Sequence, residues 1–185
     1  MRLMKSVAAV LAVFALTAVA AVAEESKKID CSDTNFDFDA PGYEVECRDA
    51  SQDSIDVSGG TIKVKIHTLH AWSPADSTFL DVISDQILGN TGIFYRRSSL
   101  ESNIGRYYTG DFEGWADEED VGNFTVKRVT ADFKDGNDPI DCLAFEKPGA
   151  RRFEGISGMT VGLACSTLGR DKALKALKHL AGEDD

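Results

Sequence analysis

The sequence lacks the short motifs by which common catalytic and cofactor sites are recognised. It has no G-x-S-x-G nucleophile elbow, no S-x-x-K, no H-E-x-x-H and no glycine-rich loop that could cradle phosphate groups. None of its four cysteines is spaced as C-x-x-C, which argues against a thioredoxin-like redox site and a zinc knuckle. The sequence therefore indicates no metal and no cofactor.

Basic residues are also scarce, since 20 Lys and Arg stand against 31 Asp and Glu. Such an acidic chain repels polyanions, so we expect no nucleic-acid partner. The one long hydrophobic run extends from Val7 to Val19. The basic residues Arg2 and Lys5 precede it, and the small-x-small pattern of residues 21–23 follows it. This is typical of a secretory signal peptide that is cleaved after residue 23.

Cleavage there would leave residues 24–185 as a single disulfide-bonded domain with no membrane span, in the periplasm or secreted. That part keeps 18 basic and all 31 acidic residues, a net charge of −13. Its four cysteines predict two disulfides, for which three pairings are possible. We favour the local pairing of Cys31 with Cys47 and of Cys142 with Cys165. In an antiparallel register, the second pair would place the ring of Phe145 opposite Gly162.

Hydrophobic periodicity predicts an α+β fold with a mainly antiparallel sheet and two amphipathic helices packed on one face. The clearest strand is Thr61–Trp72, where apolar and polar residues alternate. The two predicted helices are Pro74–Leu88, with Ser73 as its cap, and Arg170–Ala181. Further strands are expected at Phe124–Phe133 and from Ile140 to Phe145.

Two more predicted strands, Ile93–Arg97 and Ile104–Thr109, carry the candidate binding residues. These residues, which combine basic and aromatic side chains, are Arg96, Arg97, Arg106, Tyr107 and Tyr108. Neighbouring strands would bring them together into a surface for an anionic or sugar-like ligand or a protein. Ordinary cross-strand pairing of aromatic rings with arginines is the simpler interpretation of the same pattern.

The pair His67 and His70 resembles a metal-binding pair, but residues three apart on a strand point to opposite faces. We therefore expect His67 on the surface and His70 half-buried. Four acidic or amide residues alternate from Asp33 to Asp39 in a way that is similar to a calcium loop. However, Phe38 stands where an EF-hand requires glycine.

The pattern Cys142-Leu-Ala-Phe145, a polar turn, Gly162-Leu-Ala-Cys165 and an amphipathic helix resembles small exported proteobacterial proteins of unknown function. The resemblance implies a periplasmic location and a terminal unit of sheet and helix, and it implies no activity. We expect a non-catalytic exported protein that binds a protein partner or an envelope component. The alternatives are an envelope hydrolase that uses His67 or His70 with nearby carboxylates, and calcium binding by the acidic segment.

Overall fold

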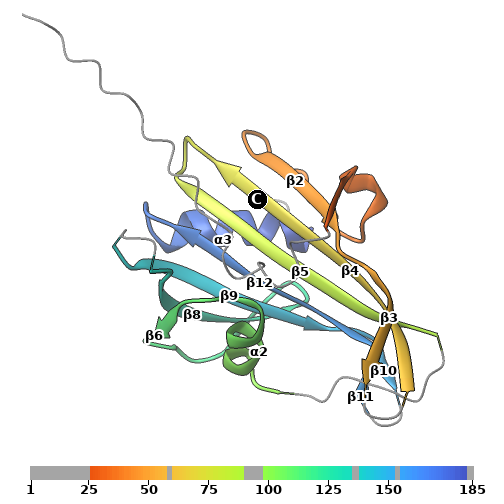
Figure 1. Cartoon of the computed structure of the whole chain (residues 1–185). Helices are drawn as coiled ribbons and strands as arrows, with labels where there is room; N and C mark the ends of the chain where they lie inside the picture. The colour runs from red at the N-terminus through yellow and green to blue at the C-terminus, as the bar shows by residue number, and fades with distance from the viewer. Residues whose placement is uncertain (1–25, 58–59, 90–97, 135–137, 153–154, 183–185) are drawn as a thin grey trace, which may run out of the picture.

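The protein has an α+β fold in which a large antiparallel sheet carries two α-helices (Figure 1). The computed structural model describes residues 26–57, 60–89, 98–134, 138–152 and 155–182, so the predicted signal peptide lies outside it. The strands are β1 Lys27–Ile29, β2 Glu44–Asp49, β3 Gln52–Val57, β4 Gly60–Ser73, β5 Thr78–Leu88, β6 Asp111–Glu113, β7 Glu119–Val121, β8 Phe124–Asp132, β9 Ile140–Pro148, β10 Arg151–Arg152, β11 Gly155–Ile156 and β12 Gly158–Ser166. The helices are the 3₁₀-helix η1 Cys31–Asp33 and the α-helices α2 Leu100–Tyr107 and α3 Arg170–Ala181.

The order of strands across the main sheet differs from their order in the sequence. It runs β1-β2-β4-β5-β12-β9-β8-β6, with β3 beside β4 and β7 beside β8, while β10 and β11 form a separate small hairpin. The last long strand, β12, therefore inserts between β5 and β9 and lies at the centre of the sheet (Figure 1).

The segment predicted as the helix Pro74–Leu88 is instead a turn followed by strand β5, so that prediction is wrong. Ser73 accepts a hydrogen bond from the backbone N–H of Asp76 at 3.4 Å, as a helix cap would, but Ser77 has a φ of 43° and turns the chain back. Phe79, Ile83 and Ile87 are four apart, and this spacing places residues on one face of a strand as well as of a helix. The segment forms a strand because it pairs with β4 on one side and with β12 on the other.

The segment predicted as the strand Ile104–Thr109 is the end of helix α2, which is a second correction. Ser99 caps the helix by accepting a hydrogen bond from the N–H of Ser102 at 3.3 Å. Leu100 and Ile104 lie one turn apart and are both buried, so one face of this short helix is anchored on the sheet. The other strand predicted there, 93–97, lies outside the described residues.

The C-terminal unit follows its predicted arrangement closely. β9 and β12 pair with Cys142 opposite Cys165 and Phe145 opposite Gly162. Disulfides join Cys142 to Cys165 and Cys31 to Cys47, as the local pairing predicted. The helix at Arg170–Ala181 was also predicted with these bounds.

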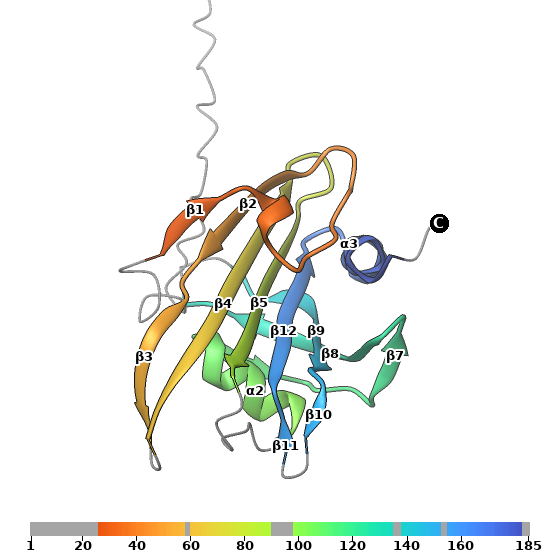
Figure 2. The ribbon, with the colours of Figure 1, turned by 90° about the vertical axis from the view of Figure 1, so that its right-hand side faces the viewer.

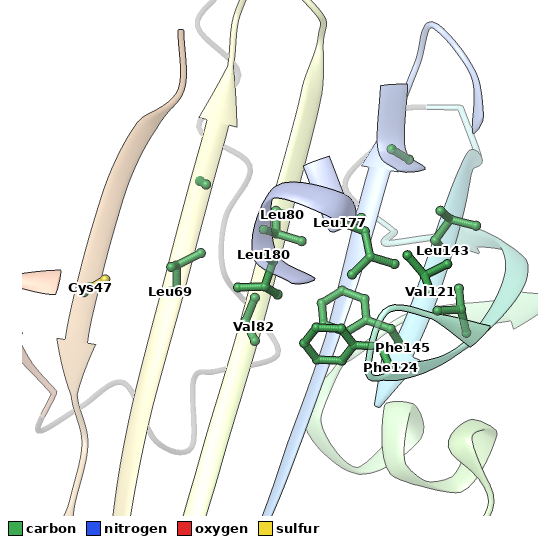
Figure 3. Packing of buried hydrophobic residues seen from close by; sticks show 14 residues of the cluster. Cys47, Leu69, Leu80, Val82, Val121, Phe124, Leu143, Phe145, Leu177 and Leu180 are labelled. Carbon is green, nitrogen blue, oxygen red and sulfur yellow. The ribbon is translucent and has the colours of Figure 1, made fainter. Parts of the chain in front are cut away.

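Both faces of the sheet are packed, and the two helices lie on opposite faces. The cluster under α3 includes Leu80, Phe145 and Leu177 (Figure 3). The cluster under α2 includes Ile83 and Leu163, which alternate with the first set along the same strands. The expectation that two helices share a face is therefore not met, because its first helix is a strand and α2 covers the other side.

The segment between η1 and β2 adds a further cover to the α3 face. In Figure 2 this orange segment curves across the sheet toward α3, which is seen end-on. Phe36, Phe38 and Tyr43 pack against the same cluster as α3, and the rings of Phe38 and His179 are 6.5 Å apart. The Cys31–Cys47 disulfide ties the start of this segment to β2.

Candidate functional site

A pocket of about 470 Å³ opens on the α3 face of the sheet, where six segments of the chain meet. Its walls come from the segment after η1, the ends of β5 and β9, the β7–β8 turn, the start of β12 and the end of α3. The lining includes Asn35, Asp37, Ser84, Asp85, Asn123, Phe124, Lys147, Thr160 and Leu180. The volume is in the range of pockets that hold small molecules.

The floor of the pocket carries a row of polar side chains. Ser84, Thr160 and Lys147 are directly opposed on β5, β12 and β9. The Thr160 hydroxyl donates to Ser84 Oγ at 3.2 Å, and the Asn35 side-chain amide donates to the same oxygen at 2.8 Å. The second bond fixes the N-terminal wall to the sheet, so this part of the pocket is preorganised.

The apolar part of the pocket is formed by Phe124 and Leu180, which are 5% and 8% exposed. Phe124 packs edge-on against Phe145, with ring centroids 5.1 Å apart. The ammonium group of Lys147 lies 5.9 Å from the centre of the Phe124 ring, within the range of a cation–π contact. The pocket therefore combines an aromatic surface, hydroxyl and amide groups, and one cation.

The polar row continues from Ser84 to His67 and Asp49 on β4 and β2, an order that suggests a nucleophilic relay. Among the described residues, however, no hydrogen bond joins His67 to Ser84 or to Asp49. Ser84 Oγ instead accepts from Asn35 and Thr160. The relay is not assembled in this arrangement.

His67 is 3% exposed, which corrects the expectation that it lies on the surface. Burial lowers the pKa of His67 and the charge of Lys65 lowers it further, while the carboxylates of Asp49 and Asp33 act in the opposite direction. The net shift is downward, so its neutral form is favoured.

His70 lies on the opposite face, as strand alternation predicts. Its Nδ1 is 2.5 Å from Oδ1 of Asp81 on β5, and Glu46 on β2 is its neighbour on the other side. Burial lowers the pKa of His70, but the hydrogen bond and charge of Asp81 and the charge of Glu46 outweigh it, so the net shift is upward. Half-buried His70 thus forms an ion pair when it is protonated.

The candidate binding residues near α2 do not form the expected cross-strand cluster. Arg106 is exposed on the helix, whereas Tyr107 donates a hydrogen bond to the buried carboxylate of Asp85. Tyr108 is 7% exposed and its hydroxyl donates to the backbone oxygen of Asp81 at 3.0 Å. Both tyrosine hydroxyls therefore attach α2 to β5. Arg96 and Arg97 lie outside the described residues, and a binding role for Arg106 stays a prediction.

The acidic segment from Asp33 to Asp39 contributes to the pocket wall through Asp37. In the described part of the chain, no group of three or more His, Cys, Asp or Glu side chains is placed to hold a metal ion. Sequence reasoning missed the pocket altogether, because its lining residues are spread from Asn35 to Gly182 and no local pattern links them.

Comparison with known proteins adds no relative to this description. No family model, no curated protein and no solved structure matches the chain. Within the described ranges, no helix is long and apolar enough to cross a membrane. The two disulfides indicate an oxidising, exported environment.

Proposed function

We propose that this protein is a non-catalytic binding protein of the periplasm or the secreted fraction, and that it binds a small component of the cell envelope. The observation that carries the proposal is the pocket of about 470 Å³ on the α3 face. It combines an apolar part, formed by Phe124 and Leu180, with a row of hydrogen-bonding groups, which is the usual composition of a small-molecule site.

The crosslinks support this proposal because each one stabilises a different wall. The Cys31–Cys47 disulfide holds the segment that contains Asn35, and the Cys142–Cys165 disulfide holds the β9–β12 pair. A pocket whose walls are fixed before binding loses little conformational entropy when a ligand enters. The export signal predicted in the first 23 residues agrees with a site that is stabilised by disulfides.

The dispersed histidines favour binding over hydrolysis. His67 is buried on β4 opposite Ser84, and among the described residues it forms no hydrogen bond with Ser84. His70 is on the other face of the sheet. The His70–Asp81 pair, with Glu46 beside it, is the observation that best supports the alternative of an envelope hydrolase. The described pocket does not include this pair, so binding remains the better-supported function.

The proposal is tested by closing the mouth of the pocket. Asn123 is exposed in the two-residue turn between β7 and β8 and lines the pocket, so Asn123→Trp would place a large side chain there without disturbing the core. The control is Thr109→Trp, at an exposed position that does not line the pocket. Each protein is mixed with the low-molecular-mass fraction of a bacterial envelope extract and examined by native mass spectrometry.

We expect wild type and Thr109→Trp to retain a bound small molecule, and Asn123→Trp to lose it. Equal retention by all three proteins would show that the ligand binds elsewhere. An absence of any bound mass on the wild type would contradict the proposed function. Conversion of an extract component, with a new product that disappears in His70→Gln, would instead support the hydrolase.

A further inference from the structure

The pocket contains a cation, Lys147, that has no partner among the carboxylates of the described residues. Lys147 is exposed at the end of β9, and it forms no ion pair with any described carboxylate. Other lysines of this acidic protein do form such pairs, as Lys127 does with Glu101 at 2.7 Å and Lys172 does with Asp76 at 2.7 Å. The ammonium group of Lys147 is instead placed near the face of Phe124, where it is available to an anionic group that enters the pocket.

The same lining contains a carboxylate, Asp37, that has no partner in the part of the chain that the structure describes. Asp37 belongs to the segment that Asn35 and the Cys31–Cys47 disulfide hold against the sheet. Its side chain is exposed, and it makes no hydrogen bond or ion pair with any described residue, Lys147 included. The lining therefore contains one lysine and two aspartates. Asp85 accepts hydrogen bonds from the backbone N–H of Met159 and the hydroxyl of Tyr107, whereas Asp37 and Lys147 form no ion pair with each other.

The rest of the lining is suited to a ligand with both apolar and hydrogen-bonding parts. Phe124 and Leu180 provide the apolar part, while Asn35, Ser84 and Thr160 provide an amide and two hydroxyl groups. At about 30 Å³ per water molecule in the liquid, the volume of about 470 Å³ corresponds to roughly 16 waters. This is more room than a single small amino acid fills.

We infer that the pocket binds a small zwitterion of short-peptide size, with the ligand carboxylate at Lys147 and the ligand amine at Asp37. The inference rests on the proposed function and adds the chemical class of the ligand. Two separate opposite charges in the lining would select both the ligand and its orientation, because the reversed orientation places like charges together. Phe124 and Leu180 would contact an apolar side chain of the ligand.

The test uses the dipeptide leucyl-phenylalanine, its N-acetyl derivative and its C-terminal amide, titrated into the protein by calorimetry at neutral pH. We expect each derivative to bind wild type about tenfold more weakly than the free dipeptide, since it loses one charge-assisted hydrogen bond. Lys147→Gln should remove the difference between the free acid and the amide but keep the N-acetyl penalty. Asp37→Asn should do the reverse.

Lys65→Gln and Asp39→Asn are the matched controls, because both side chains are exposed and lie outside the pocket lining. Both should reproduce the wild-type preferences. Equal binding of all three probes to wild type would overturn the assignment, as would unchanged preferences in Lys147→Gln and Asp37→Asn. Binding of the neutral disaccharide sucrose in place of the dipeptide would identify a sugar site and also overturn it.

The two proposals fail in distinguishable ways. If an extract component binds and Asn123→Trp blocks it, while no dipeptide binds, then the pocket is functional and the zwitterion assignment is wrong. If neither binds, the proposed function has failed together with the assignment.

Discussion

Gly162 provides the sharpest test of the packing at the centre of the sheet. A Cβ added there would lie 2.3 Å from Cζ of Phe145 and 2.5 Å from the backbone oxygen of Asp81. Phe145 is fully buried, and the oxygen belongs to the paired strand β5, so neither neighbour can move cheaply. We expect Gly162→Ala to lower the free energy of unfolding by about 1–3 kcal/mol, the usual cost of overpacking.

Shortening the ring should relieve part of this cost. Phe145→Leu removes Cζ, the side-chain atom that comes closest, while the contact with the Asp81 oxygen remains. In a double-mutant cycle by urea unfolding, Gly162→Ala and Phe145→Leu together should cost less than the sum of the single changes by about 0.5 kcal/mol or more. Strict additivity would refute the claim that the ring and the glycine are packed against each other.

Gly105 is the matched control, because a Cβ added there would meet no atom within 4 Å. It lies in helix α2, where replacing glycine by alanine favours the helix by about 1 kcal/mol. Gly105→Ala should therefore stabilise the protein under the same conditions. If Gly162→Ala stabilised the protein as Gly105→Ala does, the inference that Phe145 and Asp81 leave no room for a Cβ at Gly162 would be wrong.

Three further measurements test other parts of the structure. The pKa of His70 is raised by its interaction with Asp81, so the pair stabilises the fold below the unfolded pKa of about 6.5 and loses this effect as pH rises through the folded pKa. In urea unfolding, the free energy of unfolding of wild type should therefore exceed that of His70→Gln by at most about 1 kcal/mol, because the pair is partly exposed. This difference should shrink as the pH is raised, and a difference that grows with pH would contradict the reasoning. Replacing Cys31 and Cys47 by alanine opens a loop with a separation of 16 residues and should lower the free energy of unfolding by about 3 kcal/mol. It should also weaken binding in the pocket, because the loop forms one wall. Unchanged stability in urea would contradict the first expectation, and unchanged affinity would contradict the second. Leu177→Ala, at a fully buried position of α3, should cost about 2–5 kcal/mol in the same assay, and a smaller loss would mean that the helix is loosely docked.

The local patterns that led to correct predictions have one structural interpretation each. Strand β4 alternates apolar and polar residues from Ile62 to His67, a period of two that no helix can place on separate faces. In α3, buried Ala173, Leu177 and Leu180 recur with the period of a helix. The pairing of Cys142 with Cys165 determined the register of β9 and β12, because directly opposed residues are close enough for a disulfide.

The wrong predictions arose where one pattern fits two structures. Phe79, Ile83 and Ile87 are four apart, and four is both about one helical turn and two strand repeats. The β-branched side chains of Val82, Ile83 and Ile87 favour a strand, and they were the local signal that pointed to β5. For α2, eight residues are too few to show a clear period, and the Ser99 cap was the available signal.

The sequence by itself determined the acidic charge and predicted two disulfides, the terminal unit and export, since these follow from composition, cysteine number and local periodicity; the pairing of the cysteines was one of three possibilities until the structure showed it. The tertiary structure alone decided that β12 lies between β5 and β9, that α2 and α3 cover opposite faces, and that Asp37 and Lys147 line one pocket. The physical reason is that these features depend on contacts between segments far apart in the chain, whose formation local propensity does not encode.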